Sequence, residues 1–434
     1  MATNTPPSPQ ALDQSYWAIV RRQFRKNKLA VWSLRLLYVI IFIGLFADFL
    51  ANDLPLACRY QGETYFPVFN SYGVDLGITQ WPTALANVDW HTLNYDWVVL
   101  PPIPYSPQYM DLANADFKGP FDEQQIASTG FTHWLGTDKL GRDVLSGMIQ
   151  GTRVAMMVGV ISMSIAVILG IILGAMAGYF GDTKLKVSRI RLWLNVPFFG
   201  LAIFYAFQVR SLALADALAF SPLAFIGELL LSLFIFLVVM VIPNVLVPVL
   251  KKIPYLGRQV QIPVDILISR LIEVKVSVPT ILLILSICAI MNKPSIFITM
   301  IVIGFLGWTG IAKYIRAELL KVRSLEFIEA AQAMGLSEWR IIMRHAIPNS
   351  LTSVLITIAF GVAGAILTES SLSFLGIGVA PEQVTWGSLL SSARSYVPAW
   401  WLAIFPGFAI FITVTLFNLI GEGLTDAMDP RMKQ

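Results

Sequence analysis

The residue of this chain that could most readily do chemistry is Glu369, a carboxylate inside an otherwise apolar, serine-containing stretch. A charged group in such a stretch is costly and usually faces a protein interior or a water-filled path. Two interpretations remain open. Glu369, with Ser370 and Ser373, could lie on a translocation path or its outer gate, or nearby hydroxyls could cap the carboxylate so that it only fastens helices together. We favour the second interpretation.

A second segment, Gly136 to Asp143, superficially imitates a phosphate-binding loop. A Walker A motif ends in Gly-Lys-Ser/Thr, so that the lysine and a hydroxyl meet phosphate and magnesium. Here the end is Gly141-Arg142-Asp143, and the chain contains no other Walker A, His-Glu-x-x-His or Gly-x-Ser-x-Gly pattern. We therefore expect no catalytic site and no nucleotide or cofactor bound by this chain.

The histidines and cysteines offer little further chemistry. His345 has no second ligand at helical spacing, which favours a hydrogen bond over a metal. His91 and His133 receive no assignment. Cys58 and Cys288 fall in different environments, so we expect neither a disulfide nor a metal site.

The composition indicates what must position these groups. Hydrophobic residues make up 56% of the 434 residues and charged residues only 13%, and several apolar runs approach twenty residues. Such runs match the roughly 30 Å thickness of a bilayer core, and their continuous apolarity selects helices over a barrel. The sequence predicts an all-α, polytopic membrane protein.

Basic residues set the predicted orientation. Lys and Arg precede the first span, Leu29 to Leu50, and gather again after 180, after 250 and in 313–344, which places these segments and both termini in the cytoplasm. We count eight spans, with a short outer turn at Arg210 and Asp216. Gly170, Gly174 and Gly178 lie one helical turn apart and predict close helix packing.

The polar segment 324–348 looks like two short helices hinged at Gly335. Ser324 is a plausible N-cap of the first helix and Ser337 of the second. Gly335 permits the left-handed conformation that ends a helix, and Pro348 directs the chain into the next span. The segment is either presented to a partner or lies on the lipid surface as an ordinary amphipathic linker.

Here the sequence resembles a known family, the permease subunits of ABC importers. Their coupling loop, the EAA motif, matches at its characteristic spacing in Glu329, Ala330, Ala331, Gly335, Ile342, His345 and Pro348. Further motifs resemble the second permease of dipeptide and oligopeptide importers: Asn27–Ala30, Leu135–Asp143 with Ser146, Gly178–Gly181, Thr368–Gly376 and Asp426–Arg431.

The resemblance implies a fold and a domain organisation. We expect the ABC-importer permease fold, a core of six helices, enlarged by an inserted transmembrane hairpin at 187–265. The expected parts are a cytoplasmic tail (1–28), a first transmembrane helix (29–50), an extracytoplasmic loop region (51–150) and the permease domain (151–434). The long outer loop and the inserted hairpin depart from the usual family pattern.

The resemblance also implies a function: a subunit of an ATP-driven peptide importer in the bacterial inner membrane. Its partners would be a homologous second permease, two ABC ATPase subunits that hold ATP and Mg, an extracytoplasmic binding protein, the peptide and membrane lipid, with no nucleic acid. The alternative is a self-sufficient secondary transporter or channel, which would need ion-coupling carboxylates or broken helices near the midplane.

Overall fold

The structure is a computed structural model that describes residues 16–86, 88–126, 128–220, 222–251, 253, 255, 257–290, 295–380 and 383–428. The loose start of the predicted tail, 1–15, and the end of the closing motif, 429–431, lie outside the described residues. The chain divides into two compact units, which are described separately. One comprises Met1–Asp53, Pro101–Tyr179 and Arg270–Gln434, and the other Leu54–Leu100 and Phe180–Ser269.

Long apolar helices dominate both units, as the composition predicts. Seven helices of the described chain are long and apolar enough to cross a membrane, and one bent pair would make an eighth. The seven are built on α2 (Lys28–Leu45), α5 (Val144–Ala175), α6 (Arg189–Ile203), α8 (Pro222–Leu250), α11 (Ile296–Val322), α14 (Ile347–Phe374) and α16 (Trp401–Met428). The predicted polytopic helical fold is confirmed.

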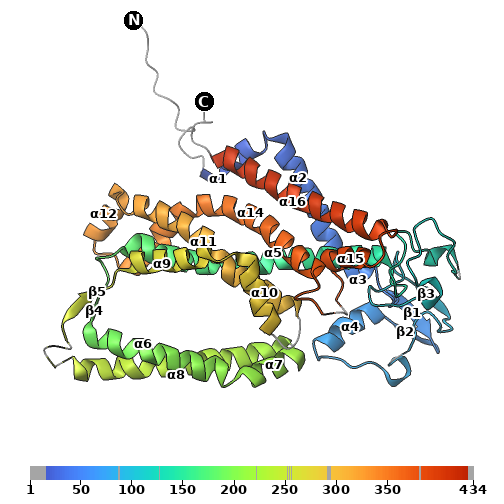
Figure 1. The fold of residues 1–434 in the computed structure, drawn as a ribbon, viewed down its shortest axis with the longest axis horizontal. Helices are drawn as coiled ribbons and strands as arrows, with labels where there is room; N and C mark the ends of the chain where they lie inside the picture. The colour runs from blue at the N-terminus through green and yellow to red at the C-terminus, as the bar shows by residue number, and fades with distance from the viewer. Residues whose placement is uncertain are drawn as a thin grey trace, which may run out of the picture. The chain divides into compact units, whose positions relative to one another are not determined.

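The core of the first unit is the pair α5 and α11, which run alongside each other with α14 against both (Figure 1). The glycine stripe makes this approach possible. A Cβ at Gly170 would stand 2.6 Å from Ile311 Cβ, one at Gly174 2.7 Å from the Ala312 carbonyl oxygen, and one at Gly178 2.7 Å from that of Arg316. The predicted close packing is confirmed, because the α11 backbone occupies the space that side chains would need.

Around this core, α16 packs on α14, and α2 packs on both α16 and α5. Asn27 caps α2 by accepting a hydrogen bond from the Ala30 amide at 3.1 Å, and its side-chain amide donates to Asp426 at 3.2 Å. The short helices α1 (Tyr16–Phe24) and α3 (Ala47–Leu50) flank α2. Two motifs from opposite ends of the sequence thus meet.

Two further helices of the described chain form a bent pair. Helices α9 (Val264–Ser277) and α10 (Thr280–Ile290) meet at an angle of 82°. Pro279 lies at the break, and a proline removes a backbone donor and disfavours the helical conformation of the residue before it. On the first unit's side, α10 packs against α11.

The second unit contains the additional hairpin. Helices α6 and α8 pack together, joined by the π-helical turn Phe204–Gln208 and by α7 (Ser211–Phe220). Strands β4 (Lys186–Ser188) and β5 (Gln259–Gln261) pair antiparallel at its base, with Lys186 opposite Gln261. The segment before α6 and the segment after α8 therefore lie side by side and close the hairpin at its base.

A turn is present at Val209 and Arg210, as predicted, but it does not extend to Asp216, because residues 211–220 form α7. Their leucine- and alanine-rich sequence has high helix propensity. Arg210 bonds Glu228 and donates to the Ser232 hydroxyl at 3.0 Å. These contacts satisfy a cation that would otherwise be costly in an apolar hairpin.

The other part of the second unit is a small subdomain within the predicted extracytoplasmic loop region, and we call it the outer subdomain. Its antiparallel sheet has the strand order β2 (Glu63–Tyr65), β1 (Ala57–Tyr60), β3 (Trp97–Val99). In the chain, helix α4 (Pro67–Asp75) lies between β2 and β3. Cys58, Leu85 and Trp90 form its core, with Trp81 packed against it. Cys58 and Cys288 are both free thiols, as predicted.

Candidate functional site

The segment hinged at Gly335 folds as two short helices at one end of α5. Helix α12 (Glu326–Ala333) ends at Gly335, whose φ is +72°, and α13 (Glu338–Ile341) continues through a π-helical turn, Ile342–Ala346, into α14. The predicted helix–glycine–helix is present. The predicted Ser324 cap is wrong: the N-cap position is Leu325, and the Ser324 hydroxyl donates to the Lys321 carbonyl.

One face of this segment is buried and holds it to the protein. Ile328 and Ala331 of α12 point inward, as do Ile341, Ile342 and Ala346 farther along. The spacing of these residues is the helical period of an amphipathic segment. Of the predicted docking residues, Ala331 and Ile342 therefore belong to the inner face.

The opposite face is exposed and unusually apolar. Met334 is 73% exposed and Trp339 71%, and Phe327 and Met343 are also exposed. Glu329 and Ala330 lie on this exposed face, and no described atom lies within 4 Å of a Cβ built on Gly335. We call the surface formed by Phe327, Glu329, Ala330, Met334, Gly335, Trp339 and Met343 the coupling face.

The last two predicted docking residues, His345 and Pro348, lie where the segment continues into α14. The His345 carbonyl accepts a hydrogen bond from the Asn349 side chain at 2.6 Å, and Pro348 occupies the first turn of α14. Proline is suited to that place, because the first turn needs no backbone donor.

Polar contacts fasten the segment to α5. The Tyr179 hydroxyl, in the π-helical turn Met176–Phe180, donates to the Glu338 carboxylate and accepts a 3.4 Å hydrogen bond from Gln332. Arg323, at the end of α11, donates to the Gly178 carbonyl, also at 3.4 Å. Both helices of the segment are therefore tied through Tyr179 to the end of α5, and α11 is tied there through Arg323. Tyr179 belongs to the Gly178–Gly181 motif, but sequence reasoning gave it no contact or role.

Glu369 lies in α14 and is only 1% exposed. Its carboxylate accepts hydrogen bonds from the hydroxyl of Ser373 at 2.5 Å and that of Ser370 at 3.4 Å, both within α14. Helix α15 (Trp386–Ala393), whose N-cap is Thr385, packs against this part of α14, where a Cβ at Gly387 would stand 2.4 Å from the Ser370 carbonyl oxygen. The Thr368 hydroxyl donates to the Gly364 carbonyl and not to Glu369.

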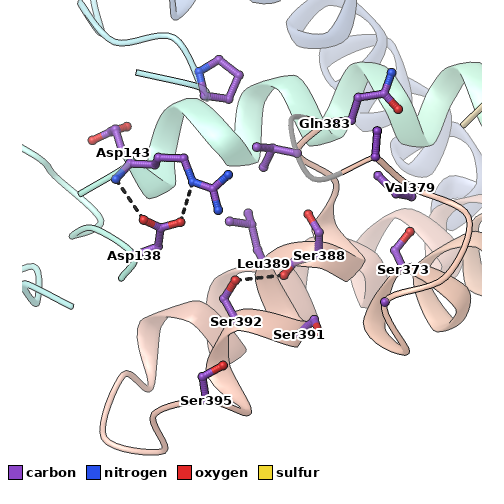
Figure 2. Close-up of a pocket in the computed structure, with 15 residues that line it drawn as sticks. Asp138, Asp143, Ser373, Val379, Gln383, Ser388, Leu389, Ser391, Ser392 and Ser395 are labelled. Atoms are coloured by element: carbon purple, nitrogen blue, oxygen red, sulfur yellow. Dashed lines mark hydrogen bonds and ion pairs between the residues drawn. The ribbon is translucent and has the colours of Figure 1, made fainter. Parts of the chain in front are cut away.

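A polar cavity of about 320 Å³ opens beside this network, at the end of the first unit opposite the coupling face (Figure 2). It is bounded by the loop before α5, the end of α14 with the loop after it, and α15. Its polar lining residues are Asp138, Arg142, Asp143, Ser373, Gln383, Ser388, Ser391, Ser392 and Ser395. In Figure 2, Asp138 lies across the cavity from the α15 serines.

The loop that imitates a phosphate site satisfies its own polar groups. Asp138 accepts hydrogen bonds from the amides of Leu140 and Arg142, at 2.8 and 3.0 Å, and from Arg142 Nε at 2.7 Å. Asp143 caps α5 by accepting from the Ser146 amide at 2.6 Å. A phosphate-binding loop would instead need to turn its free amides toward an anion.

Next to this loop the structure places a residue that the sequence left unassigned. His133 is fully buried, with Nδ1 2.8 Å from Asp143 and Nε2 3.2 Å from Asp111, and its ring stacks on Tyr105. Burial acts to lower the pKa of His133, but the hydrogen bonds and charges of Asp143 and Asp111 outweigh it, so the pKa lies above its ordinary value. Burial also raises the pKa of Tyr105.

The described residues contain no group of three or more His, Cys, Asp or Glu side chains arranged to hold a metal ion. The polar groups of the coupling segment lie at one end of the first unit, and those of the cavity and of His133 lie at the other. Within the described chain, long apolar helices connect these two polar ends.

Comparison with known proteins identifies the family. Residues 253–434 match the family described as "Binding-protein-dependent transport system inner membrane component", and residues 15–65 match the "N-terminal TM domain of oligopeptide transport permease C".

Three relatives extend the comparison. The peptidoglycan transport system permease protein YejE of Agrobacterium fabrum is 26% identical over 434 residues, covering 94% of this chain and 92% of the relative. The inner membrane ABC transporter permease protein YejE of Escherichia coli is 27% identical over 424 residues, covering 96% and 97%. The dipeptide transport system permease protein DppC of Alkalihalophilus pseudofirmus is 30% identical over 302 residues, covering 69% and 73%.

These matches agree with the fold, and permeases of this kind are non-catalytic transport subunits that work with partner ATPases and a substrate-binding protein. The chain belongs to the family of binding-protein-dependent transport system inner membrane components, the multi-pass permease subunits of inner-membrane ABC importers.

Proposed function

We propose that this chain carries peptides inward across the bacterial inner membrane, as one of two homologous permeases driven by two ABC ATPase subunits. An extracytoplasmic binding protein delivers the peptide, and ATP and Mg are held by the ATPases. Both termini and the coupling face lie on the cytoplasmic side. The observation that carries the proposal is the exposed coupling face, tied to the end of α5.

The chemistry of the coupling face suits a protein partner. Large apolar side chains that protrude together at a polar end of a protein mark an interaction site. Tryptophan and methionine are enriched at protein interfaces and provide adaptable contact area. Met334, Trp339 and Met343 supply that area here, while Glu329 adds a charge and Ala330 lets a partner backbone approach.

The path from the coupling face into the membrane is short. Movement of α12 and α13 would act on Tyr179, at the end of α5, through its hydrogen bonds with Gln332 and Glu338. Because α5 packs closely on α11 along the glycine stripe, the two would move as one body. ATP-driven closure of the ATPases could thus shift the population of inward- and outward-open states by rigid-body motion.

The names of the relatives support a peptide as cargo. Among them are a dipeptide transport system permease and a glutathione transport system permease, the second from Pectobacterium atrosepticum and 29% identical over 302 residues. Glu369, Ser370 and Ser373 take the structural role in this proposal: the two hydroxyls satisfy the buried carboxylate in the part of α14 on which α15 packs.

Two substitutions in the coupling segment test the proposal. Glu329→Lys reverses a charge on the coupling face, and Gly335→Pro imposes a φ near −65° where the chain needs +72°. Each variant should insert in the membrane, fail to co-purify with the ATPase subunits and lose peptide uptake. Glu123→Lys, a charge reversal at an exposed site in the outer loop region, is the matched control. Normal ATPase retention and uptake in both coupling variants would refute the docking assignment.

A further inference from the structure

We propose that the outer cavity beside α15 receives the C-terminal carboxylate of the peptide, with Arg142 as its counter-ion. This inference rests on the proposed function, because it assigns a place to the cargo of that importer. It gives the permease a selective contact with the peptide, separate from the binding protein.

The dimensions of the cavity suit the end of a peptide. Its volume of about 320 Å³ lies at the lower end of the range of small-molecule sites. Polar lining comes from four serines of α15 and its C-terminal end, Ser388, Ser391, Ser392 and Ser395. Apolar lining comes from Val379, Val384 and Leu389. Hydroxyls beside aliphatic side chains can accommodate both the backbone and a side chain of a terminal residue.

The acidic groups of the cavity are already satisfied. One Asp138 oxygen accepts two backbone amides, and the other accepts Arg142 Nε. Asp143 uses one oxygen on the Ser146 amide and the other on the ring of His133. Every oxygen of these two carboxylates already accepts a hydrogen bond, so a cationic ligand would find no free carboxylate oxygen on them.

Unused hydrogen-bond donors remain on Arg142 instead. Asp138 holds Arg142 through Nε, and within the described chain no hydrogen bond is recorded for its two terminal NH₂ groups. The Arg142 side chain is 23% exposed, so these groups remain accessible. A guanidinium fixed in this way presents a planar pair of donors, the arrangement that binds a carboxylate in bidentate fashion.

Two neutral groups favour a peptide end over a simple anion. Gln383 has its side-chain oxygen buried with no hydrogen-bond partner in the described structure, which is costly unless a ligand donates to it. Ser391 also lines the cavity, and no partner is recorded for its hydroxyl among the described residues. The last peptide bond supplies an N–H from the terminal residue and a carbonyl from the residue before it, which can engage an acceptor and a hydroxyl.

The charges around Arg142 also favour a carboxylate over a phosphate. Among the described lining residues Arg142 is the one cation; Asp138 offsets its charge at 2.7 Å, and the second lining acid, Asp143, is paired with His133 at 2.8 Å. A doubly charged phosphate would gain little from such a neutralised pair, whereas a single carboxylate can share the guanidinium. Ser373, which donates to Glu369, also lines the cavity, so an occupant would touch a residue that satisfies this buried carboxylate.

The test compares one peptide as free acid and as C-terminal amide, in the complete complex reconstituted with its ATPases and binding protein. The quantity measured is the ratio of free-acid to amide uptake from saturated binding protein. The permease variants cannot alter the binding protein's own preference, so a change in this ratio reports the permease alone. Arg142→Gln should lower the ratio by about tenfold.

Two further variants keep the result interpretable. Asp138→Asn combined with Arg142→Gln removes the cation without leaving a buried carboxylate unpaired, and should lower the ratio as much as Arg142→Gln. Arg394→Gln, at the end of α15 where the arginine bonds the Phe374 carbonyl and does not line the cavity, should leave the ratio unchanged.

An unchanged ratio in both Arg142 variants, in a complex that imports the peptide, would overturn the inference and leave the proposed function standing. Absence of peptide uptake by the wild-type complex would overturn the proposed function and the inference with it.

Discussion

Tyr179 and Glu338 lie 159 positions apart in the sequence, and the tyrosine hydroxyl donates a hydrogen bond to the glutamate carboxylate. The first residue ends the longest helix of the protein, and the second begins α13 of the coupling segment. Their contact is the most direct polar link between the surface proposed to receive force and the helices proposed to move. Its strength should decide how faithfully ATP hydrolysis is converted into transport.

Tyr179→Phe tests this link. The phenyl ring keeps the buried packing but removes the donor to Glu338 and the acceptor for Gln332. A hydrogen bond contributes about 1 kcal/mol, so peptide uptake per ATP hydrolysed should fall roughly threefold to tenfold while the ATPases still co-purify. Tyr65→Phe, which removes an exposed hydroxyl in the outer subdomain, is the control. Equal uptake per ATP in both variants would exclude a coupling role for Tyr179.

The glycine stripe gives a prediction about stability. Gly174→Ala would place a Cβ 2.7 Å from the Ala312 carbonyl oxygen, so α5 and α11 must separate, at a cost of about 1–3 kcal/mol. Its thermal unfolding midpoint in detergent should therefore fall. Gly310→Ala on α11 is the control, since no described atom lies within 4 Å of its Cβ position and alanine improves helix propensity. Similar midpoints for the two variants would contradict the packing argument.

The buried His133 predicts a pH dependence outside the membrane. Its pKa is higher in the folded protein than the ordinary value of 6.5, because Asp143 and Asp111 favour the charged ring against the effect of burial. The folded state therefore binds the proton more tightly than the unfolded state. The resulting stability is complete below about pH 6.5 and is lost as the pH rises through the folded-state pKa.

Limited proteolysis of the loop 101–143 should accordingly be slower at pH 5.5 than at pH 8.5. In His133→Gln this difference should shrink, because the amide does not titrate, whereas His91→Gln should behave as wild type. A wild-type protein whose cleavage rate does not change across this range would contradict the assignment of a charged His133.

Glu369→Gln tests the hydrogen bonds that satisfy the buried carboxylate in α14. The amide can replace one acceptor oxygen, but its NH₂ group faces hydroxyls that donate to the carboxylate in the wild type. The variant should assemble normally and show uptake reduced several-fold. Ser371→Ala is the control, because the Ser371 hydroxyl is exposed and bonds only within its own helix. Wild-type uptake in Glu369→Gln would remove this residue from the functional account.

Much of the membrane architecture was predictable because it depends on local patterns. Apolar length predicts the spans, and the stripe at Gly170, Gly174 and Gly178 predicts the tight pair of helices. The fold at Gly335 follows from a residue that tolerates a positive φ. These signals lie within one or two helical turns of sequence, so no knowledge of distant contacts is needed.

Features built from distant residues were not predictable. His133 acquires its role only because Tyr105, Asp111 and Asp143 converge on it from an irregular loop whose hydrogen bonds cross many residues. The link from Tyr179 to Glu338 likewise joins separate spans.

Predictions from local sequence were also wrong where a nearby group offered a competing hydrogen bond or a competing helix. At Ser324 the hydroxyl bonds backward to Lys321, so Leu325 takes the cap position. At 211–220 helix propensity placed Asp216 inside α7, so the predicted turn is limited to Val209 and Arg210.

The central claim is that this chain supplies no energy of its own and is moved by ATPases docked on the coupling face. The most direct test is peptide accumulation in proteoliposomes that contain either the complete complex with ATP or the purified chain alone. We predict uphill accumulation only with the complete complex and ATP, and its loss in Glu329→Lys. Accumulation against a gradient by the chain alone, without nucleotide or partner subunits, would contradict the account.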